Sequence, residues 1–188
     1  MSERGRLTAY TQMALLNAIA LSLISVQAIF SPTFLLLLWI IPVIFAIQAT
    51  IMPLRLVLLS CLIVAGIALL ILGLDVGATT LLYVLTGTTA GTLRRWKWPA
   101  ALRIPMTALV LAAMLAGGFV AGLTLVLGQS INSTLAEAQP YFQLIGGTRT
   151  LLLNLALGLA GLALIFSVAI DTLTSGILSR LALRGAVV

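Results

Sequence analysis

Long apolar segments with almost no charge follow one another through this chain of 188 residues. Charged residues make up only 7% of the chain, whereas a soluble domain carries about 25%. Such a chain cannot build a water-solvated surface, so we expect the lipid bilayer to be its solvent. A helix needs roughly 17–25 residues to cross the hydrocarbon core, and six segments suit that length. They lie at about 13–29, 34–50, 54–74, 76–93, 104–127 and 151–173.

The segments predict an all-α fold, a polytopic membrane bundle of six transmembrane helices in one domain over residues 1–188. Pro32 and Pro53 mark the turns before the second and third segments, and Gly73 lies at the end of the third. The first apolar run follows basic residues, as in a signal peptide, but no convincing small-residue cleavage site precedes Pro32. We therefore expect a retained first helix.

The basic residues fall on one side of this layout. With the amino terminus in the cytoplasm, nine of the ten Lys and Arg residues lie in cytoplasmic segments, and only Arg149 lies outside. Cytoplasmic loops of membrane proteins carry such an excess of positive charge. The pattern predicts a multi-pass protein of the cell inner membrane with both termini cytoplasmic. The nine residues are Arg4, Arg6, Arg55, Arg94, Arg95, Lys97, Arg103, Arg180 and Arg184.

One loop between the fourth and fifth segments concentrates this charge together with two of the three tryptophans. Lys and Arg are attracted to an anionic leaflet, and Trp rings favour the headgroup layer. A nucleic-acid partner would need a soluble domain around the charge, and the sequence has none. We expect the loop residues to lie on the cytoplasmic membrane surface. They are Arg94, Arg95, Trp96, Lys97 and Trp98.

The sequence carries no signature of an enzyme. It contains no histidine, which excludes His general bases and His metal sites. Its single cysteine, Cys61, excludes an internal disulfide. Phosphate-binding loops and dinucleotide-binding fingerprints are absent as well. We expect no catalytic activity, no cofactor and no metal.

Polar groups inside membrane segments are costly and are therefore candidates for specific contacts. Asp171 lies near the inner end of the sixth segment, beside the basic loops, and predicts an ion pair with an arginine there. Asn17 and Gln48, in the first and second segments, are expected to make helix–helix hydrogen bonds. The candidate partners of Asp171 are Arg94, Arg95 and Arg180.

Small residues recur four apart within several segments, a spacing that lets membrane helices approach closely. Ala14 and Ala18 form such a pair in the first segment, and Gly87 and Gly91 form one in the fourth. Each pair is consistent with packing inside the bundle or with a face that binds another subunit. Two further pairs are Gly118 with Gly122 and Ala156 with Ala160.

The longest polar stretch, residues 128–149, follows the fifth segment on the outer side. Its part from Thr134 to Gly146 begins with a helix-capping pattern and contains Pro140, so it predicts either a short amphipathic lid or a solvated linker. Polar side chains here and near the outer leaflet are the candidates for binding a small solute. They are Gln27, Asn132, Glu137, Gln143 and Asn154.

Six short helices, cytoplasmic termini and the Ala14-xxx-Ala18 pair resemble the S component of an energy-coupling factor (ECF) vitamin transporter. The layout also resembles the uncharacterised YybS-like membrane proteins, thought to share that fold. The resemblance implies a subunit that captures a small solute from the outer side. It also implies that Ala14 and Ala18 pack on the transmembrane coupling subunit, which works with a pair of ATPases. The chain differs from that family in its very short first loop, and it carries no recognisable motif for one vitamin.

Two other functions remain open. One is a non-catalytic accessory or scaffold subunit of a larger membrane complex, whose small-residue faces bind neighbouring proteins. The other is a small transporter or channel that works as an oligomer. Ion-coupled transport usually requires a buried carboxylate or broken helices near the membrane midplane. The sequence places no acidic residue at that depth, which favours the subunit interpretations.

Overall fold

The structure, a computed structural model, describes residues 3–30, 37–121 and 148–183. Over these ranges the regular elements are α-helices, which confirms the predicted all-α class. The helices are α1 (Glu3–Phe30), α2 (Leu37–Ile51), α3 (Leu54–Leu72), α4 (Leu74–Arg95), α5 (Ala100–Ala121) and α7 (Thr148–Leu183). The segment from Thr134 to Gly146, predicted to be a lid or a linker, lies outside the described residues.

Four of the described helices are long and apolar enough to cross a membrane. The sequence predicted six equivalent spans, and two of those helices differ from the rest. α2 contributes a shorter apolar stretch, Ile40–Ile51, and the threonine-rich α4 is not among the four. The four candidate stretches are Thr8–Val26 in α1, Leu54–Leu72 in α3, Ala100–Gly117 in α5 and Ala156–Leu181 in α7.

α2 and α4 lie at the centre of the packing between the described helices. α2 packs against α1, α3, α4 and α7, and every residue from Ile41 to Ala49 is buried. In α4 the hydroxyls of Thr80, Thr86 and Thr92 donate to carbonyls one turn back, at 2.7–2.8 Å. Threonine is therefore tolerated in α4 because its polar group is satisfied within the helix.

α2 and α4 approach so closely that two positions of α4 accept only glycine. A Cβ atom added at Gly87 would lie 2.2 Å from the carbonyl oxygen of Pro42, and one at Gly91 would lie 2.2 Å from that of Ala46. The pair spaced four residues apart thus faces a neighbouring backbone inside the bundle. This confirms the close helix approach predicted for Gly87 and Gly91, with α2 as the partner.

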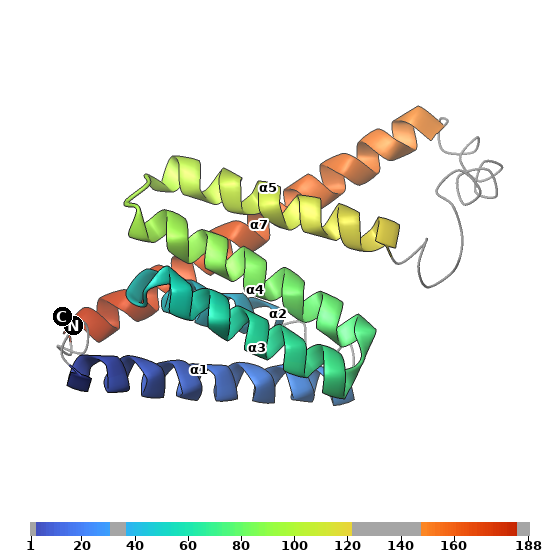
Figure 1. Ribbon diagram of the computed structural model, residues 1–188. Helices are drawn as coiled ribbons and strands as arrows, with labels where there is room; N and C mark the ends of the chain where they lie inside the picture. Colours follow the sequence, from blue (N-terminus) through green and yellow to red (C-terminus); the bar gives the residue numbers. More distant parts are fainter. Residues whose placement is uncertain (1–2, 31–36, 122–147, 184–188) are drawn as a thin grey trace.

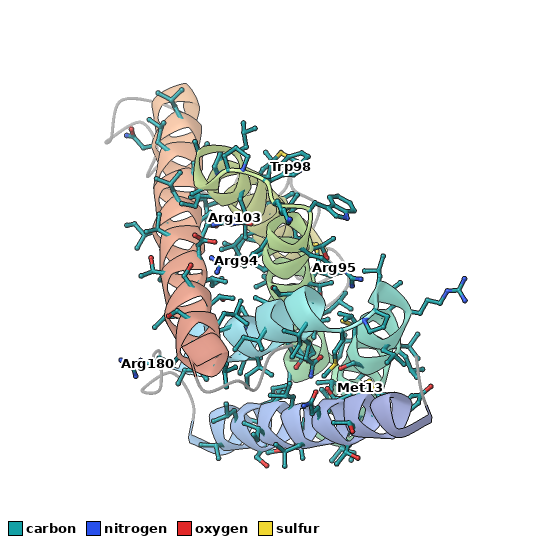
Figure 2. All side chains as sticks on the ribbon, turned by 90° about the vertical axis from the view of Figure 1, so that its left-hand side faces the viewer. Met13, Arg94, Arg95, Trp98, Arg103 and Arg180 are labelled. Carbon is teal, nitrogen blue, oxygen red and sulfur yellow. The ribbon has the colours of Figure 1, made fainter. Side chains whose placement is uncertain are left out.

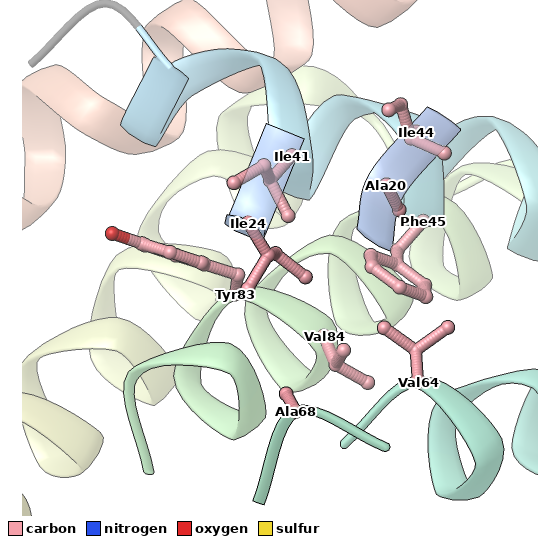
Figure 3. Close-up of a cluster of buried hydrophobic side chains, with 9 residues drawn as sticks. All are labelled: Ala20, Ile24, Ile41, Ile44, Phe45, Val64, Ala68, Tyr83 and Val84. Carbon is pink, nitrogen blue, oxygen red and sulfur yellow. The ribbon is translucent and has the colours of Figure 1, made fainter. Parts of the chain in front are cut away.

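The side chains around this contact form the main hydrophobic core, which draws on α1, α2, α3 and α4 (Figure 3). On the other side of the bundle, Ala108 and Leu111 of α5 pack against Ala163 of α7. The main cluster consists of Ala20, Ile24, Ile41, Ile44, Phe45, Val64, Ala68, Tyr83 and Val84.

The chain runs back and forth so that several connections share one end of the molecule. The start of α1, the α2–α3 turn, the α4–α5 loop and the end of α7 lie together on the left of Figure 1. The start of α7, which carries Arg149, lies at the opposite end. We call the first of these the basic end. Its described basic residues are Arg4, Arg6, Arg55, Arg94, Arg95, Lys97, Arg103 and Arg180.

α7 is longer than the sequence pattern indicated. The expected sixth segment ended at about 173, whereas α7 continues to Leu183. The helix runs obliquely across the bundle, and its amino-terminal part extends past the end of α5 (Figure 1).

Candidate functional site

A charged cluster joins three helices at the basic end. Asp171 of α7 accepts hydrogen bonds on both carboxylate oxygens from Arg103 of α5, at 2.6 Å from Nε and 2.8 Å from Nη2. Arg94 of α4 donates from Nη2 to the same carboxylate at 2.8 Å. The Arg103 contact is a bidentate guanidinium–carboxylate pair, and two parallel hydrogen bonds make such a pair strong and directional. One carboxylate therefore ties α4 and α5 to α7.

The cluster is largely withdrawn from solvent. The side chains of Arg94, Arg103 and Asp171 are 16%, 12% and 14% exposed. Arg94 also donates to the backbone carbonyl of Asp171 at 3.0 Å and to the hydroxyl of Ser175. Arg103 donates to the carbonyl of Trp98 at 3.0 Å. With both oxygens already engaged, this carboxylate fits a structural clamp better than an acid–base group for a substrate.

The sequence predicted only part of this cluster. The pair of Asp171 with Arg94 is confirmed, but the stronger partner, Arg103, was not among the candidates. Arg95 donates instead to the carbonyl of Met52, and Arg180 is exposed near the end of α7. Figure 2 shows Arg94 and Arg103 beside α7, whereas Arg180 points away from the bundle. Finding Arg103 requires knowing that α5 packs along α7, which no local pattern encodes.

The predicted membrane-surface set also needs a correction. Arg94 is not a surface residue, because α7 packs beside it and Asp171 binds its guanidinium. Lys97 is exposed, and Trp96 and Trp98 are 61% and 37% exposed. Arg95 is exposed as well, although its guanidinium contacts Met52. The α4–α5 loop thus presents one lysine between two tryptophans at the basic end.

A second polar cluster lies in the interior between α1, α2 and α3. Gln48 donates from Nε2 to Oδ1 of Asn17 at 2.9 Å, so the predicted helix–helix hydrogen bond of these residues is confirmed. The Ser60 hydroxyl lies within hydrogen-bond distance of both Asn17 Oδ1 and Gln48 Oε1, and its single proton serves one of them at a time. Gln48 and Ser60 are fully buried. These contacts fix α1 on α2 and α3.

The residues predicted to bind a solute are not brought together within the described part of the chain. Asn132, Glu137 and Gln143 lie outside it, and so does the side chain of Gln27. Asn154 is exposed near the amino-terminal end of α7. The solute site therefore stays a prediction.

The two alanine pairs point away from the described core. Ala14 and Ala18 are exposed on α1, and Ala156 and Ala160 are exposed on α7. Gly122 lies outside the described residues, so its pair with Gly118 stays a prediction. The structure therefore leaves two alanine pairs accessible on the outer helices.

Neither a metal centre nor a known relative assigns a function to the described surfaces. Among residues 3–30, 37–121 and 148–183, no group of three or more His, Cys, Asp and Glu side chains is placed to hold a metal ion. No protein-family model, curated protein or solved structure matches this chain.

Proposed function

We propose that the chain is a six-span protein of the cell membrane with both termini in the cytoplasm. Four helices already have the length and apolar character of membrane spans. α2 and α4 lie among them as the helices with most of the packing contacts, and all the connections rich in Arg and Lys share one end. The positive-inside tendency assigns that end to the cytoplasm.

We further propose that this protein is a subunit of a larger membrane complex and docks through α1. The observation that carries the proposal is the exposure of Ala14 and Ala18. On the adjacent face of α1, Met13, Asn17 and Ala20 are buried against the bundle. The bundle therefore does not use the alanine pair for its own packing. Small residues on an accessible helix face let a second helix backbone approach closely.

The specific form that we propose is the S component of an ECF-type transporter, which captures a small solute from the outer side. The coupling subunit would occupy the alanine face of α1, and its ATPases would complete the complex. A small polar solute would bind in the outer half of the bundle. Its proposed ligands are Gln27, Asn132, Glu137, Gln143 and Asn154.

An accessory or scaffold subunit is the second candidate. It is favoured by the amino-terminal half of α7, where Leu153, Leu157 and the pair Ala156 and Ala160 are exposed. In that case a neighbouring membrane protein would pack on α7, and no solute would be needed.

Replacing Ala14 and Ala18 together with leucine is expected to abolish the complex while the isolated protein stays folded. Two leucines would overpack a close helix contact, at a cost on the order of 3 kcal/mol, which is about a hundredfold in affinity. Both positions are exposed in the isolated chain, so its unfolding free energy should change by less than about 0.5 kcal/mol. Co-purification from native membranes in mild detergent measures the first effect, and thermal unfolding measures the second.

The matched control replaces Ala156 and Ala160, an exposed alanine pair of the same spacing, with leucine. An S component retains its coupling subunit and ATPases in this control and loses them only in the α1 variant. If the α7 variant instead releases the partner, the accessory-subunit proposal is favoured. Unfolding of the isolated α1 variant would show that the pair serves internal packing and would end the docking proposal.

A further inference from the structure

α4 ends in a specific hydrogen-bonded turn that sets the position of Lys97. The backbone N–H of Trp98 donates to the carbonyl of Leu93 at 3.1 Å, and that of Lys97 donates to the carbonyl of Arg94 at 2.9 Å. These two bonds define the Schellman motif, in which the residue just past the helix adopts a left-handed backbone. Lys97 is that residue, with φ of 58°. The turn therefore holds Lys97 at the tip of the loop between α4 and α5.

Lysine is an unexpected residue at this position. Glycine, and less often asparagine, usually occupies it, because other L-residues rarely adopt a left-handed backbone. Among the described residues, Lys97 is the one non-glycine residue with positive φ. The turn by itself would be better served by glycine. The lysine side chain is thus present despite the local backbone preference, and such positions often serve a function.

The surroundings of Lys97 separate it from the other cations of the loop. Arg94 and Arg103 bind the carboxylate of Asp171, and Arg95 donates to a backbone carbonyl. Lys97 is exposed, and within the described part of the chain it makes no ion pair. It is the cation of this loop that is free for an external anion.

The loop also lies at the depth of lipid headgroups if α5 spans the bilayer. The membrane-crossing stretch of α5 begins at Ala100, directly after Trp98 and Pro99. Trp96 and Trp98, on either side of Lys97, are both exposed. Exposed indole rings beside an apolar span favour the headgroup layer, where phosphate groups are concentrated. Arg55 and Arg180 are also exposed cations at this end, but neither has a tryptophan beside it in the chain.

We propose that the turn Trp96-Lys97-Trp98 binds the headgroup of an anionic phospholipid. The Lys97 ammonium contacts the lipid phosphate, while the two indole rings lie among the neighbouring headgroups. The site selects anionic over zwitterionic lipid because the Lys97 charge is not neutralised by the protein. This property is independent of docking through α1.

The test measures fluorescence quenching of Trp96 and Trp98 by brominated lipids. A Trp39→Phe background leaves these two as the tryptophans of the chain. The protein is placed in phosphatidylcholine vesicles that contain brominated phosphatidylglycerol or, separately, brominated phosphatidylcholine. We expect phosphatidylglycerol to bind about fivefold more tightly, since one lysine near an anionic surface contributes about 1 kcal/mol and 1.4 kcal/mol is tenfold.

Three variants separate this site from general surface charge. Lys97→Ala and Lys97→Gly are expected to remove most of the preference, although glycine should also raise the melting temperature because it suits the left-handed turn. Arg180→Ala, at an exposed cation of the same end, should leave the preference intact. The proposal would be overturned if Arg180→Ala lost as much of the preference for phosphatidylglycerol as Lys97→Ala did. It would also be overturned if Lys97→Ala kept the preference unchanged. Competition by excess inorganic phosphate would overturn it too, because it would indicate a site for free anions.

Discussion

Replacing Gly87 with alanine is expected to be, like the same change at Gly91, among the most destabilising single-methyl changes in the described helices. The added Cβ would lie 2.2 Å from the Pro42 carbonyl oxygen and 2.9 Å from Phe45 Cβ, so α2 and α4 must separate. Overpacking in a core costs up to about 3 kcal/mol, and here the obstacle is backbone, which cannot rotate out of the way. Thermal unfolding in mild detergent should show this loss.

Gly66 on α3 provides the matched control, because a Cβ added there meets nothing within 4 Å. Alanine is a better helix former than glycine by about 1 kcal/mol, so Gly66→Ala should be neutral or stabilising. If the Gly87→Ala and Gly66→Ala variants both unfold at the wild-type temperature, the close contact between α2 and α4 is refuted.

Removing the carboxylate of Asp171 is expected to have the second large effect. Asp171→Ala leaves two largely buried guanidinium groups without their anion, and the Nε atom of Arg94 already has no hydrogen-bond partner among the described residues. Breaking a buried pair costs about 3–5 kcal/mol. We expect about 3 kcal/mol, because Arg94 keeps its bonds to a carbonyl and to Ser175, and Arg103 keeps its bond to the carbonyl of Trp98.

Two comparisons show whether the charge itself is responsible for that loss. Thr172→Ala changes the exposed neighbour of Asp171 on α7 and should shift the unfolding free energy by less than about 0.5 kcal/mol. The double variant Asp171→Ala with Arg103→Ala should lose less than the sum of its single variants, since the two residues interact directly. Additive losses, or a stable Asp171→Ala protein, would mean that the cluster does not hold α7 to α4 and α5.

The sequence predicted best those structural features that depend on a single local pattern. The apolar segments predicted an all-α fold, and the spacing of Gly87 and Gly91 predicted a close helix contact. The spacing does not show which helix a pair of small residues packs against. Gly87 and Gly91 proved to face α2, whereas Ala14 and Ala18 remained exposed. Both pairs look alike in the sequence, so only tertiary packing distinguishes them.

Contacts between distant segments account for what could not be predicted. Arg94 was expected both on the membrane surface and as a candidate partner of Asp171, and only the packing of α7 beside the end of α4 shows that it takes the second role. The bond of Arg103 to the same carboxylate depends on the same packing. Ser60 joins Asn17 and Gln48 only because three helices meet at that point. Periodicity and charge show which residues are unusual, but not which of them lie next to each other.

Cysteine accessibility in intact cells tests the proposed membrane topology most directly. In a Cys61→Ala background, single cysteines replace Asn132, in the proposed outer segment, and Lys97, at the tip of the α4–α5 loop. A membrane-impermeant maleimide should label the Asn132 variant in intact cells and the Lys97 variant only after the membrane is permeabilised. Labelling of the Lys97 variant from outside, with protection of the Asn132 variant, would contradict the cytoplasmic assignment of the basic end.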